Sequence, residues 1–478
     1  MKKIGLLLCV LMVLLTASCS NILVSDGDGG SISLVIDGAT AQSIRSAGAL
    51  RSTTGGSTYT LTASIRGDYT ATQSVSSSAD GLGAVTFTFE RVPAGRSIIL
   101  DLAATVNGKY IWYGNSGKHT VKRGENQLQI AVGRVSGVLV WNNTSVKIAP
   151  YGKHDFDAAT SVLNPKVPPV WCFDNTGNLY VVLKDGGGIH RYDLQVDGTY
   201  PLRASDNYSY QDMCTTLSYD KVAKKLYVLD SNTPLYELTD SGSQEVIGGD
   251  PAQNLVGLAV HNNIAYIAQL GVTEGENGEL VLSLVKYDLP YGGNTKSGDE
   301  MVHHQLPVSF GTFADSITGQ MIYQDGALYL LLGSFSVSSS TTDTEVQSCG
   351  ALLRINPSTL TLDTSFGSNG YLGLVSGRTI SGTYNSDGYS MKLYSPTASN
   401  ENSAFYGPVG FVAVMPKKLV IADAGYALSK GSDDKLRARR KNRVVTVDLE
   451  TQAFDVASLS DTTFYGNITT GCGFLVVE

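Results

Sequence analysis

Alternating apolar and polar positions recur along this 478-residue chain from residue 31 onward. Before residue 135, five segments place an apolar residue at or near every second position: 31–36, 59–65, 84–89, 97–103 and 127–132. A period of two is typical of a strand with one buried face, and turn-forming residues separate several of these segments. Residues 31–135 are therefore predicted to form a small β-sandwich.

A repeated pair of strands fills residues 137–478. Five units place an apolar–Tyr–apolar strand after a turn, with Val in place of Tyr in the fifth, and a second apolar strand follows each one. The first strands are centred on Tyr180, Tyr227, Tyr266, Tyr329 and Val420. Paired short strands without helical segments between them cannot form βαβ units, but stacked radially they form the blades of a β-propeller.

The chain as a whole is thus predicted to be all-β, with the sandwich preceding the propeller. We expect six blades, with seven as the alternative. The sixth blade would join the two ends of the propeller, residues 473–477 (GFLVV) pairing with residues 138–141. Joining the ends in this way closes the ring and leaves no free edge strand.

The first 30 residues have the pattern of an export signal followed by a tether. Lys2 and Lys3 precede an apolar run over residues 4–15, and small residues follow it. A charged start, a short apolar run and small residues predict a signal peptide over residues 1–18. The mostly polar, Gly-rich residues 19–30 predict a flexible tether.

Cys19 directly follows the small residues and changes the expected fate of this segment. The arrangement resembles the lipobox of bacterial lipoproteins, although Thr16 and Ser18 depart from the usual residues at their positions. The resemblance implies that Cys19 is acylated, as by palmitate, and holds the protein on a membrane of the bacterial cell envelope. Secretion without a lipid is the alternative.

Two further segments resemble known domain families. The stretch from Phe87 through residues 92–95 (VPAG) to a last strand after residues 124–126 is similar to the transthyretin-like or Ig-like domains attached to many surface proteins, which implies a spacer. Residues 408–445 resemble an NHL-type repeat, and residues 173–180 repeat its first half. This second resemblance supports a propeller but implies no function, because propellers bind ligands, hold partners or catalyse.

The composition excludes several classes of protein. Hydrophobic residues make up 42% of the chain and charged residues 16%, which is too apolar for a disordered chain and too low in charge for a coiled coil. The net charge is −8, so no overall basic field attracts nucleic acid. Nucleic acid is therefore not expected among the partners.

Catalytic and metal-binding motifs are absent from the sequence. It contains no G-x-S-x-G, H-E-x-x-H, Walker or EF-hand pattern, and we expect no cofactor and no metal. His303 and His304 are adjacent, so on a strand they would point to opposite faces, and a solvated turn is the expected setting. Asp174 and Asp220 lie in turn-like sequences, where carboxylates accept backbone hydrogen bonds.

The connections between strands point to a binding surface. The hairpin between the two strands of a unit is much longer in the third, fourth and fifth units than in the first two. Equivalent hairpins of a propeller lie on one face, and we expect the long connection over residues 367–402 to reach the same face. Loops on a rigid scaffold are where binding residues concentrate.

The content of these loops suggests a partner protein or a glycan of the cell envelope. Tyrosines among Ser, Asn and Gly offer rigid stacking faces with adaptable hydrogen bonds, and the candidates are Tyr384, Tyr389, Tyr394 and Tyr426. A basic run over residues 435–443 adds the candidates Arg437, Arg439 and Arg440. Two alternatives stay open: the tyrosines pack the loops onto the propeller, and the basic run is a solvated loop.

An enzyme is the rival function, as a propeller-fold hydrolase or lyase that acts on an extracellular polymer at the central channel. Such an enzyme needs charged side chains on the innermost strands. Residues 170–172, 257–259 and 411–413 have a packing character instead, which favours binding over catalysis.

The cysteines outside residues 1–19 are scattered, which argues against a zinc site. Cys172 in an inner strand and Cys472 before the last apolar segment would be neighbours if the ring closes as expected. A disulfide between them is therefore a possibility, Cys172 with Cys214 is the competing pair, and unpaired cysteines acting as small apolar fillers are the third option.

Overall fold

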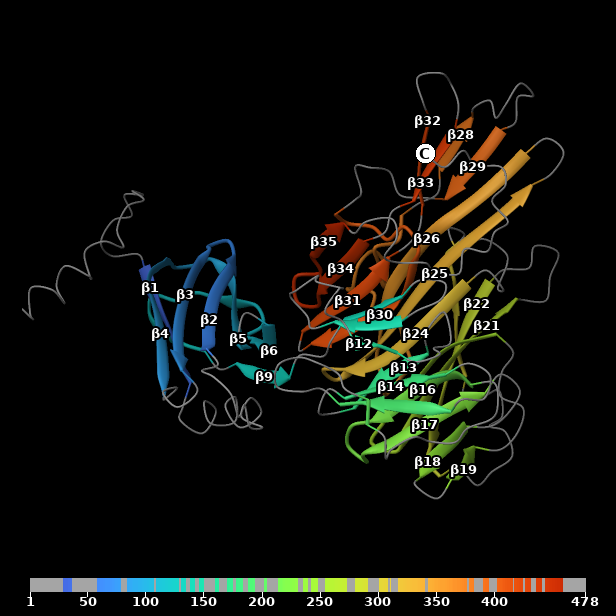
Figure 1. Ribbon diagram of the computed structural model, residues 1–478. Helices are drawn as coiled ribbons and strands as arrows, with labels where there is room; N and C mark the ends of the chain where they lie inside the picture. The colour runs from blue at the N-terminus through green and yellow to red at the C-terminus, as the bar shows by residue number, and fades with distance from the viewer. Residues whose placement is uncertain are drawn as a thin grey trace, which may run out of the picture.

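The computed structural model describes the chain in the following ranges: 29–36, 58–78, 84–106, 109–128, 130–134, 138–141, 146–149, 160–162, 170–174, 178–183, 188–193, 202–203, 214–230, 235–239, 242–247, 254–272, 280–290, 301–307, 310, 317–339, 343–375, 378–381, 390–394, 402–415, 417–423, 426–430, 436–440 and 443–458. The elements assigned within these ranges are all β-strands (Figure 1). Within them, no helix has the length and apolar character that crossing a bilayer requires.

Residues 29–134 form two sheets around one buried cluster. One sheet has the strand order β4-β1-β8 and the other β3-β2-β5-β6-β9, with β7 against β5. The strands are β1 (Gly29–Ile36), β2 (Thr58–Gly67), β3 (Ala71–Ser78), β4 (Val85–Pro93), β5 (Ser97–Val106), β6 (Lys109–Asn115), β7 (His119–Thr120), β8 (Gly124–Gln127) and β9 (Ala131–Arg134). Alternate residues of β1 and β2, among them Ile32, Leu34, Leu61 and Ala63, are buried between the sheets. The predicted β-sandwich is confirmed.

Two details of the sandwich differ from the sequence prediction. Residues 127–132 were expected to be one strand, but β8 ends at Gln127 and β9 begins at Ala131 in the other sheet. Strand β3 has no apolar alternation, because its outward hydroxyls bond to those of β2, with Ser76 Oγ 2.8 Å from Thr60 Oγ1. A polar strand held by a neighbouring strand leaves no periodic signal in its own sequence.

Residues 138–458 form successive antiparallel sheets, the blades of the propeller, each named below by its first strand. In the described part of the chain these are six: β10-β11-β12, β13-β14-β15, β16-β17-β18-β19, β20-β21-β22-β23, the β24 blade (β24-β25-β26-β29-β28, with β27 against β26) and β30-β31-β34-β35. Their bounds are β10 (Val138–Trp141), β11 (Val146–Ala149), β12 (Thr160–Ser161), β13 (Trp171–Phe173), β14 (Leu179–Val182), β15 (Ile189–Tyr192), β16 (Cys214–Asp220), β17 (Lys225–Asp230), β18 (Leu235–Thr239), β19 (Gly242–Ile247), β20 (Leu255–His261), β21 (Ile264–Val272), β22 (Leu280–Asp288), β23 (Val302–Gln305), β24 (Ile317–Gln324), β25 (Ala327–Ser339), β26 (Asp343–Ile355), β27 (Tyr371–Leu372), β28 (Arg378–Ser381), β29 (Ser390–Tyr394), β30 (Pro408–Met415), β31 (Lys418–Asp423), β34 (Arg443–Asp448) and β35 (Phe454–Ser458).

The first strands of the blades line the centre. Strand β13 contacts β16, β16 contacts β20, β20 contacts β24, β24 contacts β30, and β30 contacts β10. The five units found in the sequence are the second and third strands of five of these blades, paired as predicted. The number of blades in the closed ring stays a prediction, because residues 473–477 lie outside the described residues.

The propeller has two distinct faces, because successive strands of a blade run in opposite directions. We call the face with the turns between first and second strands the turn face. The face with the hairpins between second and third strands, and with the connections from one blade to the next, is called the insertion face.

The turns of the turn face are short and linked from blade to blade. Asn262 and Asn263, between β20 and β21, both have positive φ angles, 52° and 59°, as a two-residue hairpin turn of the favoured twist requires. Asp220, at the end of β16, accepts the N–H of Asn263 at 2.7 Å. Asp325 accepts the N–H of Lys417 at 2.9 Å in the same way, two blades further on. These carboxylates fasten neighbouring blades together.

The sandwich contacts the propeller at the β30 blade. Arg66 of β2 donates to Asp101 of β5, with Nε 2.5 Å from Oδ2, and also to Asp448 at the end of β34. Lys418 of β31 lies with its Nζ 4.6 Å from the centre of the Tyr113 ring, and Tyr113 belongs to the buried cluster of the propeller. Burial lowers the pKa of Lys418. We call these five residues the junction.

Candidate functional site

The insertion face carries hairpins of very different length. In the β16 blade the pairing of β17 with β18 ends at Leu229 and Leu235. In the β20 blade β21 and β22 stay paired out to Val272 and Leu280, and in the β24 blade β25 and β26 are 13 residues each and stay paired out to Ser339 and Thr344. The insertions predicted in the third and fourth units are therefore extensions of the blade strands themselves.

A second hairpin joins the extended end of the β24 blade. Strand β29 pairs in parallel with residues 343–347 of β26, and β28 pairs with β29. Both strands come from the long connection between the β24 and β30 blades. The connection therefore reaches the insertion face, as the sequence predicted, and Figure 1 shows β25 and β26 projecting from the disc with β28 and β29 beside them.

A third hairpin is inserted in the β30 blade. Strands β32 (Tyr426–Lys430) and β33 (Leu436–Arg440) pair with each other and form a separate two-stranded sheet between β31 and β34. In Figure 1 it lies at the same end of the propeller as β28 and β29. We call β28, β29, β32, β33 and the ends of β25 and β26 the hairpin cluster.

A buried ion pair closes the base of the β32–β33 hairpin. Asp423, the last residue of β31, is the register partner of Arg443, the first residue of β34, and both side chains are at most 1% exposed. Arg443 Nη2 lies 2.6 Å from Asp423 Oδ2, and its guanidinium lies 4.3 Å from the centre of the Tyr406 ring. The pair holds the hairpin at the point where it leaves the blade.

The same ion pair fixes the end of the long connection. Asp423 accepts the backbone N–H groups of Tyr406 and Gly407, the latter at 2.7 Å, and Arg443 donates to the carbonyl oxygen of Ala404. One ion pair thus anchors both the β32–β33 hairpin and the end of the long connection before β30.

Glycines allow the next strand to approach closely. Gly333 of β25 and Gly350 of β26 are register partners, and a Cβ atom at either would collide with Pro408, the first residue of β30. The small residues let β30 pack directly against the base of the extended β24 blade.

The predicted site residues fall on these elements as far as they are described. Tyr394 is the last residue of β29, Tyr426 the first of β32, and Arg437, Arg439 and Arg440 lie in β33. The backbone register pairs Tyr426 with Arg440. Tyr384 and Tyr389 lie outside the described residues.

Part of the loop interpretation is corrected. The basic run over residues 435–443, for which a solvated loop was one of two interpretations, contains strand β33, and Arg443 at its end is buried against Asp423. Tyr371 and Tyr406, two tyrosines beside the loops, are buried in the propeller, and burial raises the pKa of Tyr371 to about 12. Those two tyrosines pack the structure and are not available to a partner.

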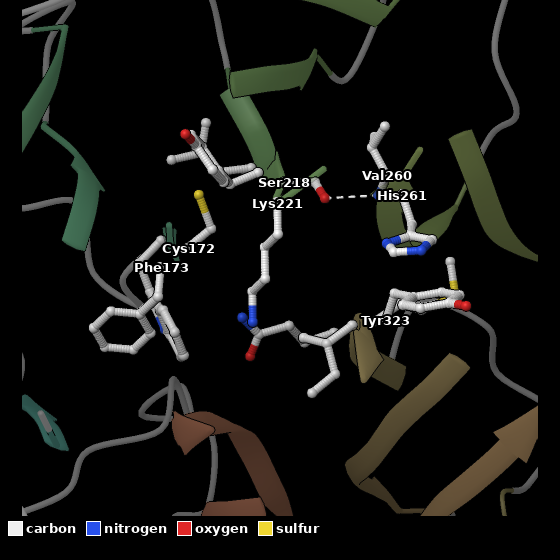
Figure 2. Close-up of a pocket in the computed structure, with 13 residues that line it drawn as sticks. Cys172, Phe173, Ser218, Lys221, Val260, His261 and Tyr323 are labelled. Carbon is white, nitrogen blue, oxygen red and sulfur yellow. Dashed lines mark hydrogen bonds between the residues drawn. The ribbon is translucent and has the colours of Figure 1, made fainter. Parts of the chain in front are cut away.

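The central channel holds a small pocket at the turn face. It has a volume of about 70 Å³, and its walls come from β13, β16, β20 and β24 with the turn after β16. Its polar or titratable lining residues are Cys172, Ser218, Tyr219, Lys221, His261, Gln320 and Tyr323. Figure 2 shows the Lys221 side chain reaching into the middle, between Cys172 and Phe173 on one side and His261 and Tyr323 on the other.

Sequence reasoning missed this pocket. Residues 170–172, 257–259 and 411–413 were interpreted as packing. Leu258, Ala259 and Phe411 are indeed fully buried, but Trp171 and Cys172 line the pocket. Other pocket residues, among them Lys221 and His261, lie further along the inner strands or in the turns that follow, so extending the inspection to the strand ends would have found them.

The carboxylates and histidines that the sequence analysis considered form hydrogen bonds within the protein. Asp174 accepts hydrogen bonds from the backbone N–H and side-chain amide of Asn178, and Asp220 accepts three backbone N–H groups, so both predictions of turn carboxylates are confirmed. His303 and His304 lie on strand β23 rather than in a turn. They bond separately, to Ser283 Oγ and to the carbonyl oxygen of Leu360, and the described residues contain no cluster that could hold a metal.

The disulfide prediction is not tested. Cys172 lies in the inner strand β13, as expected, and faces the channel pocket. Cys472 lies outside the described residues, as does Cys19.

Comparisons with known proteins add the following. A family described as the TdpA C-terminal domain matches residues 385–470, less than half of the chain. No curated protein matches the sequence.

Similar solved structures include a quinonprotein alcohol dehydrogenase-like protein from Bacteroides thetaiotaomicron, with 11% identity, TM-score 0.32 and coverage of 84% of this chain and 89% of that one. AztD from Citrobacter koseri shares 11% identity with TM-score 0.30, covering 70% and 82%. Virginiamycin B lyase from Staphylococcus aureus shares 12% identity with TM-score 0.27, covering 68% and 95%. At these values the similarities carry no functional argument.

Proposed function

We propose that this chain is an exported, lipid-anchored protein of the bacterial cell envelope, whose propeller binds a partner protein or glycan through the hairpin cluster. The observation that carries the proposal is the parallel pairing of β29 with residues 343–347 of β26. It joins an inter-blade connection to the extended end of a blade hairpin. The paired strands form a platform that projects from the insertion face of the propeller.

The residue types of the cluster fit this role. Its strands carry Tyr394, Tyr426, Arg437, Arg439 and Arg440. Tyr and Arg are the residue types enriched where binding energy concentrates, because they offer large surfaces and several hydrogen bonds. The buried pair of Asp423 and Arg443 supports them by fixing the base of the β32–β33 hairpin, and a fixed base lowers the entropy that binding costs.

The channel suits the rival function less well. A pocket of about 70 Å³ is far below the roughly 300–1,000 Å³ of sites that enclose drug-sized ligands. A unit of an extracellular polymer is of that larger size. The observed volume therefore favours the hairpin cluster over the channel as the place where a large partner binds.

Membrane attachment rests on the N-terminal sequence alone, that is, on the apolar run, the small residues and Cys19. Metabolic labelling with a fatty acid is expected to mark the exported wild type and not Cys19→Ser. Equal labelling of the two proteins would contradict the lipid anchor and leave simple secretion.

Partner binding is tested with the exported Cys19→Ser chain and envelope fractions. We compare it with two variants, Arg437/Arg439/Arg440→Ala and Tyr394/Tyr426→Ala, and with Arg354→Ala as a matched control on the opposite face of the β24 blade. If the partner is anionic, the arginine variant is expected to lose binding, and most of the salt dependence of binding disappears with it. A neutral glycan is expected to be lost with the tyrosines. A captured partner that both variants bind as tightly as the control does would contradict the hairpin cluster as the binding surface.

A further inference from the structure

The amine of Lys221 occupies the middle of the channel pocket without a bonded counter-charge. Its side chain leaves the turn after β16 and reaches inward among four strands of different blades (Figure 2). In the described part of the chain, no ion pair or hydrogen bond of its ammonium is found. Lys221 lines the pocket and has no bonded counter-charge among the described residues, so its ammonium is available to a ligand that brings the opposite charge.

The carboxylates nearest to this amine are already engaged. Asp325 and Asp174 act on Lys221 electrostatically, but Asp325 accepts the N–H of Lys417, and Asp174 accepts two hydrogen bonds from Asn178. Asp220, the neighbour of Lys221 in sequence, is fully buried and accepts backbone N–H groups of two turns. These acids belong to the turns of the turn face, which leaves the amine for a molecule from outside.

Two further polar groups of the pocket, Gln320 and Ser218, accept hydrogen bonds from the backbone and keep donors of their own. Gln320 Oε1 accepts the N–H of Phe411 at 2.8 Å, which directs the side-chain NH₂ of Gln320 away from that bond. Ser218 Oγ accepts the N–H of Val260 at 2.8 Å and keeps its own proton to donate. Lys221, Gln320 and Ser218 therefore present donors to the pocket, and donors without acceptors suit an anion.

The walls are flat and apolar. His261 stacks on Tyr323 with ring centres 3.7 Å apart and planes 7° apart, and Trp171 and Phe173 line the opposite side. The volume of about 70 Å³ has room for roughly five water molecules. A ligand of four to six heavy atoms with a planar charged end and a short apolar tail matches both the walls and the donors.

We propose that the turn-face mouth of the channel binds one small carboxylate, of the size of acetate to butyrate, with the ammonium of Lys221 as its counter-ion and the side-chain amide of Gln320 as a second donor. The site is separate from the hairpin cluster, which lies on the other face. A carboxylate there balances the charge of the amine.

The titration of the site gives a second signature. Burial lowers the pKa of Lys221, and burial also lowers the pKa of His261. The titratable groups around the amine are Cys172 and Asp174 from the β13 blade, Tyr219 and Asp220 from β16, His261 from β20, and Tyr323 and Asp325 from the β24 blade. An anion stabilises the charged amine, so binding above the lowered pKa of Lys221 takes up a proton.

The test is titration of acetate, propionate and butyrate into the exported Cys19→Ser chain, followed by calorimetry and by ligand-observed NMR. We expect one site, and a loss of affinity of at least tenfold in Lys221→Met. The matched control is Lys224→Met, a lysine of the same turn that does not line the pocket, and it is expected to bind as the wild type does. Circular dichroism and thermal unfolding verify that the variants are folded.

A second variant keeps the proposal falsifiable if Lys221→Met disturbs the turn. Gln320→Glu preserves an oxygen for the N–H of Phe411 but replaces the donating NH₂ with an acceptor, so it is expected to abolish binding. Unchanged affinity in either variant would overturn the proposed site. Phosphate or chloride binding as tightly as acetate would overturn the carboxylate, and equal binding enthalpies in alkaline buffers of different ionisation enthalpy would overturn the coupling to Lys221.

Discussion

The two faces of the propeller treat the same repeated blade differently. On the turn face the turns between first and second strands are short, several of their residues adopt left-handed backbone conformations, and Asp220 and Asp325 each tie one turn to the next blade. On the insertion face the strands of the β24 blade run on, and extra hairpins join them. The turns of the turn face form hydrogen bonds that hold the blades together, whereas the insertion face accommodates additional strands.

The difference teaches where variation is tolerated. A turn that donates its backbone N–H to the neighbouring blade fixes both its length and its conformation. A hairpin whose base is closed by Asp423 and Arg443 can change beyond that base without disturbing the blade below. Three predictions follow the comparison, from the largest expected effect to the smallest.

Removing the root of the insertion face is expected to have the largest effect. Arg443→Met leaves the carboxylate of Asp423 buried without its cation, and such a change costs about 3–5 kcal/mol of the free energy of unfolding. Urea unfolding of the exported chain measures it. The control is Arg354→Met, which breaks a half-exposed pair with Asp363 and is expected to cost below about 1 kcal/mol. If the two variants lose equal amounts of the free energy of unfolding, the buried pair of Asp423 and Arg443 does not anchor the inserted segments.

Breaking a link of the turn face is expected to have an intermediate effect. Burial raises the pKa of Asp220, but the N–H groups of Asn263, Ala223 and Val222 outweigh it and hold that pKa below its ordinary value. Asp220→Asn is therefore expected to lower the free energy of unfolding by about 1–3 kcal/mol at neutral pH.

The pH dependence gives the sign of this effect. A carboxyl whose pKa is lower in the folded than in the unfolded state stabilises the protein at a pH above the unfolded-state pKa. This stabilisation is lost as the pH falls through the folded-state pKa. The difference between wild type and Asp220→Asn should thus shrink below about pH 4. Asp455→Asn, at an exposed position of β35, serves as the control. A difference that stays constant down to pH 2 would contradict the role of the charged carboxylate.

Changing the length of the insertion face is expected to have the smallest effect. Replacing residues 382–389 with a short Gly-Ser linker should change the free energy of unfolding by less than about 1 kcal/mol, because loop length alone contributes little. The matched change on the other face is the insertion of two glycines between Asn262 and Asn263, which removes the bond to Asp220 and should cost clearly more in the same assay. If both changes cost the same, the two faces do not differ in tolerance.

The blades were predictable because each repeats one pattern. Tyr227 and Tyr266 stand at equivalent strand centres, both buried, and the packing of one blade on the next selects the same residue type each time. Strand β3 was missed because its Ser and Thr hydroxyls face solvent, and β8 and β9 were merged because their residues alternate across a change of sheet.

The site was predictable in place but not in detail. Hairpin lengths located the insertion face, since length is written directly in the sequence. The burial of Arg443 was not predictable, because its partner Asp423 is 20 residues away and only the pairing of β31 with β34 brings them together. Lys221 was missed for a related reason, since its neighbours in the channel come from four blades.

The junction settles how a mechanical load would pass through the protein. Arg66 and Tyr113 of the sandwich meet Asp448 and Lys418 of the β30 blade, and the same blade carries the β32–β33 hairpin. A pull between the sandwich and that hairpin therefore has a path through the β30 blade, besides the covalent connection from β9 to β10. The same blade is bonded to the channel pocket, because the N–H of Phe411 in β30 donates to Gln320, so tension at the hairpin would reach one wall of the pocket through this bond.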